Sequence, residues 1–88
     1  MAQDHYTSKE VATRGKAIYE ERIRPLVEAV HRGKFVIIDV ETGDFEIDVD
    51  DLTATKRALG KHPGAVLYGM RIGYPVAYHL GGRFTVVS

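Results

Sequence analysis

The segment from residue 35 to residue 50 has two runs that favour β-strands, one on each side of a glycine. Residues 35–40 are rich in β-branched side chains and residues 45–50 alternate apolar and acidic ones, so both runs predict strands, and Gly43 between them predicts a turn. A slip of one residue would move the apolar side chains to the acidic face, so the turn should contain an even number of residues. The expected hairpin pairs Val40 with Phe45 and places Asp39 opposite Glu46. Its apolar face carries Val36, Ile38, Val40, Phe45, Ile47 and Val49.

The other face of this hairpin is acidic and offers the first candidate site. Residues 35–55 hold seven carboxylates and no basic side chain. Like charges that face each other destabilise a sheet, so solvent, a basic neighbour or a cation should relieve this face. We expect it to act as a contact surface for a partner protein, formed by Asp39, Glu41, Glu46 and Asp48.

A catalytic interpretation of the same residues is the alternative. Asp39-x-Glu41-Thr42, at the end of an apolar strand, is similar to the first motif of proofreading 3′–5′ exonucleases, in which carboxylates hold two divalent metal ions. That chemistry needs further carboxylates from distant elements, and no acidic residue follows Asp51. We therefore expect no enzyme, no catalytic residue and no metal. A divalent-metal-dependent nuclease or hydrolase at Asp39 and Glu41 remains the alternative, as does a weak ion site at Asp39, Glu46 and Asp48.

The charges fall into blocks although the net charge is zero. Residues 9–34 hold seven basic and four acidic side chains, and residues 56–88 hold five basic and no acidic ones. Blocks of opposite sign can attract each other within the chain or between two copies, and pairing within the chain is the preferred prediction. A zero balance makes nucleic acid an unexpected partner. The alternative is a nucleic-acid-binding regulator with an aromatic and basic surface formed by Tyr68, Tyr74, Tyr78, Arg71 and Arg83.

A kinked helix is expected before the hairpin. Thr7-Ser8-Lys9-Glu10 fits a capping box, and apolar residues then recur every three or four positions. Pro25 should kink or restart the helix near Arg24, and Gly33 should end it. The basic residues of this helix, Arg22 and Arg24, are the second expected contact surface. The apolar positions of the pattern are Val11, Gly15, Ile18, Tyr19, Ile23, Leu26, Val27 and Val30.

Further elements complete a single α+β domain. Asp50 or Asp51 should cap a short helix that runs to about Leu59 and buries Leu52, Ala58 and Leu59. Strands are expected over residues 65–72 and 76–80, with a short fifth over 83–87. The predicted order is α-β-β-α-β-β(-β), with an antiparallel or mixed sheet and helices packed on one face. Residues 1–6 should form a flexible tail and residues 7–88 the domain.

Composition removes several classes of function. The chain has no cysteine, and its four histidines show no spacing typical of metal ligands. It has no apolar run of membrane-spanning length and no signal-peptide pattern at its start, so we expect a cytoplasmic protein without membrane contact or cofactor. The edge strand expected within residues 74–88 predicts pairing with another chain or a homo-oligomer.

Three runs of residues resemble a known group of proteins: 15–26 (GKAIYEERIRPL), 33–48 (GKFVIIDVETGDFEID) and 71–74 (RIGY). They are similar to an uncharacterised family of small bacterial, cyanobacterial-type proteins, often encoded beside retropepsin-like aspartic proteases or in toxin–antitoxin-like pairs. The resemblance implies a partner-dependent accessory protein and assigns no catalytic residue. Ala29-Val30 replace the Pro-Glu usual in that family, so the helix should continue there.

The expected function is that of a non-enzymatic protein-interaction module. The chain would act through a partner protein, encoded by a neighbouring gene, as an antitoxin-like protein or an accessory subunit. The acidic hairpin face and the kinked basic helix are the expected contact surfaces.

Overall fold

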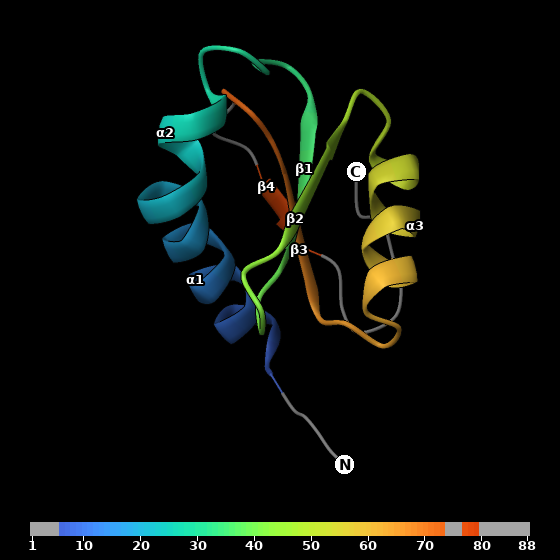
Figure 1. Ribbon diagram of the computed structural model, residues 1–88. Helices are drawn as coiled ribbons and strands as arrows, with labels where there is room; N and C mark the ends of the chain where they lie inside the picture. Colours follow the sequence, from blue (N-terminus) through green and yellow to red (C-terminus); the bar gives the residue numbers. More distant parts are fainter. Residues whose placement is uncertain (1–5, 74–76, 80–88) are drawn as a thin grey trace.

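The structure, a computed structural model, describes residues 6–73 and 77–79 of the chain. A four-stranded antiparallel sheet lies between two helical layers (Figure 1). The predicted α+β domain is therefore confirmed. Its elements are α1 (Ser8–Ile18), the π-helix η1 (Tyr19–Ile23), α2 (Arg24–Val27), β1 (Phe35–Asp39), β2 (Phe45–Asp48), α3 (Asp51–Lys61), β3 (Leu67–Arg71) and β4 (Ala77–His79).

The predicted capping box begins α1. The Glu10 amide donates to Thr7 Oγ1 at 3.1 Å, and the Thr7 amide donates to Glu10 Oε1 at 2.8 Å. These two bonds satisfy amides that the first helical turn leaves without partners. Tyr6, assigned to the tail by sequence, packs against the hydrophobic core. Residues 1–5 lie outside the described residues.

The predicted interruption at Pro25 is confirmed, and it takes the form of a π-helical turn. The Arg24 amide donates to the carbonyl of Tyr19, five residues earlier. In a regular α-helix the ring of Pro25 would clash with the carbonyl four residues before it, and the wider turn precedes this point. Pro25 itself stands in the first turn of α2, where its missing amide costs no helical hydrogen bond.

The helix ends at Val27, so the expected end at Gly33 and the continuation through Val30 are wrong. The amides of Val30 and His31 both donate to the carbonyl of Val27, at 3.1 and 2.7 Å. This shared acceptor closes the helix with a tight turn. Leu26 and Val30, which the spacing assigns to the buried face, are 68 % and 73 % exposed.

The sheet has the order β2-β1-β3-β4, and all neighbours are antiparallel. The apolar residues of the hairpin share one face as predicted, with Val36 opposite Ile47 and Ile38 opposite Phe45. The predicted pairing of Val40 with Phe45 is wrong by two residues. Because a slip of two residues keeps every side chain on its face, the division of side chains between the two faces is the predicted one despite the wrong register. Burial differs from the prediction at Val49, which is 72 % exposed.

Both faces of the sheet are buried, so the expectation that the helices pack on one face is wrong. The layer of α1, η1 and α2 covers one face and α3 the other (Figure 1). Ile37 and Leu67 stand on the second face and need cover from water. The first core is formed by Val11, Tyr19, Ile23, Val27, Val36, Ile38, Val40, Tyr68, Met70 and Ile72. The second is formed by Ile37, Ala54, Ala58, Ala65 and Leu67.

The helix α3 begins as predicted, with Asp50 as its cap. Asp50 Oδ2 accepts from the Thr53 amide at 2.9 Å. The expectation that Leu52 is buried is wrong, since it is 39 % exposed, whereas Ala54 and Ala58 face the sheet. Small side chains on this face let the helix lie close to the strands. Because α3 joins β2 to β3, which lie on either side of β1, it crosses the second face of the sheet.

The C-terminal predictions are described only in part. β4 covers the centre of the strand expected over 76–80, whereas the strand expected over 83–87 lies outside the described residues. The pairing edge expected within residues 74–88 also lies largely outside them. Within the ranges that the structure describes, no helix is long and apolar enough to cross a membrane.

Candidate functional site

Asp39 is a structural residue of the hairpin turn. It ends β1 and is 3 % exposed. Its Oδ1 accepts from the amides of Glu41 at 2.9 Å and Thr42 at 3.2 Å, and its main-chain carbonyl accepts from the Gly43 amide at 2.8 Å. A carboxylate that binds the amides following it fixes the reversal of the chain. The predicted position of Asp39 in an exposed acidic surface is therefore wrong, and its opposite residue is not Glu46.

Glu41 stands at the exposed tip of the same turn. Gly43 has a φ of +84°, and a Cβ at this position would lie 3.1 Å from Arg22 Nη1. Arg22 thus extends from η1 to the backbone of the turn. In the described part of the chain, neither Arg22 nor Glu41 has an ion pair. The two predicted contact surfaces therefore meet at this turn.

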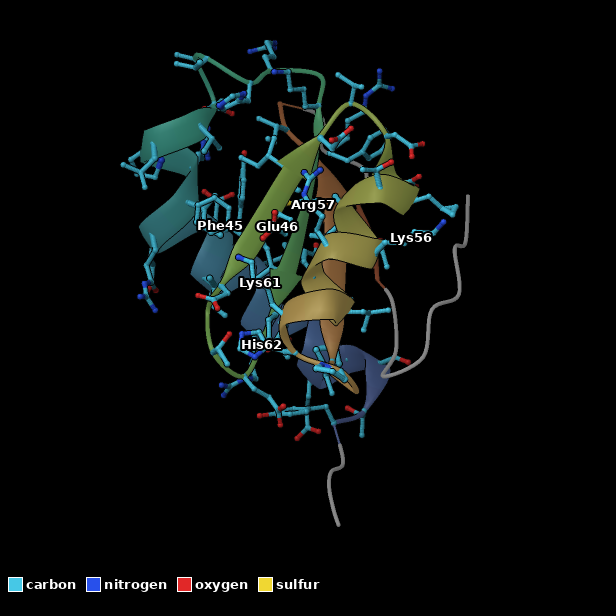
Figure 2. All side chains as sticks on the ribbon, turned by 45° about the vertical axis from the view of Figure 1, so that its right-hand side comes forward. Phe45, Glu46, Lys56, Arg57, Lys61 and His62 are labelled. Atoms are coloured by element: carbon cyan, nitrogen blue, oxygen red, sulfur yellow. The ribbon has the colours of Figure 1, made fainter. Side chains whose placement is uncertain are left out.

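Glu46 lies beside α3, close to Arg57 and Lys61 (Figure 2). Asp48 also pairs with Arg57. Arg57 Nε donates to Glu46 Oε1 at 3.0 Å, and Arg57 Nη1 donates to Asp48 Oδ2 at 3.0 Å. Arg57 Nη2 donates to the main-chain carbonyl of Ile47 at 2.7 Å, and Lys61 forms an ion pair with the other oxygen of Glu46. Arg57 and Lys61 are four residues apart and so share one face of the helix.

These contacts shift the pKa values of the groups involved. Partial burial, the largest influence on Glu46, raises its pKa, but hydrogen bonds from Lys61 and Arg57 together hold the pKa below its usual value. The Asp50 amide and then Arg57 lower the pKa of Asp48. The hydrogen bonds that Arg57 and Lys61 donate, first of all to Glu46, raise their pKa values. All four groups are charged at neutral pH, so their charges compensate one another.

A third contact fastens the far end of α3 to the hairpin. His62, which follows α3, lies with its Nε2 2.9 Å from Asp44 Oδ2. This hydrogen bond lowers the pKa of Asp44. Together with the ion pairs of Arg57 and Lys61, it joins the acidic block of the chain to the basic block that follows. The predicted pairing of these blocks within the chain is confirmed.

Arg24, the second basic residue predicted for the contact surface, is occupied along the helix itself. Arg24 Nη1 lies 2.7 Å from Glu20 Oε1, and Arg24 Nε lies 2.9 Å from Glu28 Oε1. The hydrogen bonds that Arg24 donates to Glu28 and Glu20 raise its pKa further above its usual value. Arg22 is therefore the freer of the two guanidinium groups.

The acids of the catalytic alternative are not gathered into one site. Asp39 is buried in the turn, Glu41 is exposed, and Glu46 and Asp48 bind Arg57. Among the side chains that the structure describes, those of residues 6–73, no three of His, Asp or Glu lie together in a way that would hold a metal ion. In the nucleic-acid alternative, Tyr68 is 2 % exposed and packs in the first core, so it offers no face to a base.

Sequence reasoning missed an exposed apolar pair on the kinked helix. Leu26 lies in α2 and Val30 in the turn after it, one helical turn apart, and Arg22 precedes Leu26 by four residues. We call Arg22, Leu26 and Val30 the α2 surface. A π-helical turn contains one more residue than an α-helical turn, which rotates the following residues by about 100°. Pro25 marks that interruption in the sequence, but it does not fix which residues turn outward.

Comparison with known proteins assigns the chain to no family. No protein-family model matches the sequence, and no curated protein and no solved structure matches it. The functional proposal therefore depends on the contacts and exposed groups described above.

Proposed function

We propose that this chain is a non-enzymatic protein-interaction module that acts through a partner protein, as an antitoxin-like protein or an accessory subunit. The observation that supports this function is the α2 surface, where two large apolar side chains, Leu26 and Val30, are more than two-thirds exposed one turn apart. Scattered exposed apolar residues are normal, but adjacent ones beside an arginine are typical of contact surfaces.

The charge around the α2 surface indicates what the partner presents to it. Arg22 and Arg32 are exposed, and neither has an ion pair among the residues that the structure describes. Arginine beside apolar side chains is common at the energetic centre of interfaces. A complementary partner would place apolar side chains against Leu26 and Val30 and carboxylates near the two arginines.

The acidic hairpin contributes less to the proposed contact than its sequence indicates. Glu46 and Asp48 are compensated by Arg57, and Asp39 is buried. Glu41 is the exposed member of the four predicted acids, and it lies on the turn that Arg22 approaches. The proposed contact therefore extends from the α2 surface to the tip of the hairpin.

Recovery of the tagged chain from the cells that naturally produce it tests the proposal. The wild-type chain should co-purify with a partner in a fixed ratio, and Leu26→Asp or Val30→Asp should remove that partner. Both positions are exposed, so each substitution should change the free energy of unfolding by no more than about 0.5 kcal/mol. Urea unfolding of each purified variant would confirm that lost binding is not lost folding.

A matched substitution on the other side of the sheet is the control. Leu52→Asp makes the same change on α3 and should leave the partner bound. Arg22→Glu should weaken the complex if the partner is acidic at this point. Recovery of the wild-type chain alone, or equal binding by Leu26→Asp and Leu52→Asp, would contradict the proposal.

A further inference from the structure

The outer edge of the sheet at β2 has backbone groups that β1 does not use. The Asp39 amide donates to the carbonyl of Asp44 at 2.8 Å, so the backbone of Asp44 faces β1. Successive residues of an antiparallel strand point their backbone groups alternately inward and outward. Glu46 therefore faces β1, whereas Phe45 and Ile47 direct their amides and carbonyls away from the sheet. An outward row of this kind is where another strand would pair.

Arg57 occupies the centre of this row. Its guanidinium donates to the main-chain carbonyl of Ile47 at 2.7 Å and, on either side, to Glu46 and Asp48 at 3.0 Å. One side chain thus binds three consecutive residues of the edge strand. At Ile47 it makes the hydrogen bond that the amide of a neighbouring strand would make.

A second copy of this chain has a register that fits the edge. If two β2 strands pair antiparallel with Ile47 on the two-fold axis, Phe45 lies opposite Val49 of the second copy. Val49 is 72 % exposed, and such a pair would cover it. In the same register Glu46 lies opposite Asp48 of the second copy, where like charges repel. Apolar pairing thus favours this register, and two features oppose it: the carboxylates and the occupied carbonyl of Ile47.

We propose that the β2 edge is a pairing surface for a second copy of this chain and that Arg57 holds it closed. This role is independent of the proposed partner contact, which uses the α2 surface. The two carboxylates hold the guanidinium at the carbonyl, and the guanidinium keeps the edge from another strand. Arg57 and Lys56 differ in this respect, since Lys56 points away from β2 (Figure 2).

The test separates two effects: the repulsion between Glu46 and Asp48 of the second copy, and the occupation of the Ile47 carbonyl by Arg57. In Glu46→Gln the like-charge pair is removed, while Arg57 keeps Asp48 and the carbonyl of Ile47. In the double variant Glu46→Gln with Arg57→Gln, the carbonyl is also released, and the net charge returns to that of the wild-type chain. Sedimentation velocity at about 100 μM should show a monomeric single variant and a double variant that associates at least about tenfold more tightly. Amide exchange at Phe45 and Ile47 should slow with concentration in the double variant alone.

Two controls make the outcome decisive. Glu46→Gln with Lys56→Gln carries the same charge as the double variant and should behave like Glu46→Gln. Glu46→Gln with Arg57→Lys keeps a cation at position 57, but a lysine cannot bind all three acceptors, so this variant should associate to an intermediate degree. It provides a test even if the variant with Arg57→Gln unfolds. Protected amides in β1 and β3 report that each variant is folded. A folded double variant that stays monomeric, or equal association by Glu46→Gln alone, would overturn the proposal.

Discussion

A single glycine determines how closely α1 approaches the sheet. A Cβ at Gly15 would lie 2.3 Å from Tyr68 Cγ and 2.6 Å from Tyr68 Cβ, which is far inside van der Waals contact. The ring of Tyr68 therefore packs directly on the helix backbone. Since Tyr68 is 2 % exposed in the first core, any movement of its ring would disturb the packing of that core.

Gly15→Ala should destabilise the protein although alanine favours helices. Propensity alone would add up to about 1 kcal/mol of stability, whereas the clash with Tyr68 should cost about 1–3 kcal/mol. Urea unfolding followed by circular dichroism measures the net change. Gly60→Ala is the control, because Gly60 also lies in a helix and nothing lies within 4 Å of its added Cβ. That variant should be more stable by about 0.5–1 kcal/mol, and equal effects at the two glycines would contradict this account.

The buried hydroxyl of Tyr19 leads us to expect that another conservative substitution, Tyr19→Phe, does not destabilise the protein. Tyr19 is 2 % exposed, and its hydroxyl has no hydrogen-bond partner within the described part of the chain. Burial raises the pKa of this group. Because an unpaired buried hydroxyl loses its bonds to water, Tyr19→Phe should leave stability unchanged or raise it by about 1 kcal/mol. Thermal unfolding would measure this, with Tyr6→Phe as a partly exposed comparison, and a loss above 1 kcal/mol would show that the hydroxyl has a stabilising role.

At the scale of elements, α3 is fastened to the hairpin by charged groups along one side. The pKa of each of the three carboxylates is lowered: that of Asp44 by His62, which follows α3, that of Glu46 by Lys61 and Arg57 against the effect of burial, and that of Asp48 first by the Asp50 amide and then by Arg57. The unfolded chain, whose carboxylates titrate near pH 4, therefore takes up protons before the folded chain does as the pH falls. The stability that these groups add is complete above about pH 5 and is lost toward about pH 2.

We predict that the free energy of unfolding decreases as the pH falls, mainly because Asp44, Glu46 and Asp48 become protonated. Glu46→Gln should reduce the pH dependence between about pH 5 and pH 2, since it removes the carboxylate that both Arg57 and Lys61 bind. Glu41→Gln, at the exposed turn, is the matched control and should keep more of the wild-type slope. Urea unfolding at several pH values gives the slopes, and indistinguishable slopes for the two variants would contradict the assignment.

The elements themselves were largely predictable from sequence, and their relative placement was not. The capping box at Thr7, the interruption at Pro25 and the faces of the hairpin depend on neighbouring residues, which sequence shows directly. The register of the hairpin was missed because Asp39 accepts from two amides and so lengthens the turn. The alternation of side chains shows only whether the turn has an odd or an even number of residues. A shift of the register by two residues keeps the same alternation, so the sequence does not reveal it.

The candidate site shows the same division. The sequence indicated pairing between the acidic and basic blocks, but it did not indicate that Arg57 would bind Glu46 and Asp48 at once. That contact requires α3 to cross the second face of the sheet, which is a property of the strand order. The exposure of Leu26 was missed for a related reason, because the π-helical turn changes which side of the helix faces the core.

At the scale of the whole molecule, one strand supports two separate cores. β1 pairs with β2 on one side and with β3 on the other, and its side chains point alternately toward the two helical layers. Val36 and Ile38 belong to the core under α1, η1 and α2, while Ile37 belongs to the core under α3. All three are fully buried. The two helical layers do not need to touch each other to be coupled, because each depends on the same strand.

A substitution in one core should therefore weaken both layers. Ile37→Val removes one methyl group beneath α3 and should lower the free energy of unfolding by about 0.5–1.5 kcal/mol. If the domain unfolds as one unit, the most protected amides of α1 and α3 should exchange faster by the same factor, about fivefold for 1 kcal/mol. Val36→Ala makes the reciprocal test from the other core. Faster exchange confined to α3 in the first variant, or to α1 in the second, would show that the layers unfold separately and that β1 does not couple them.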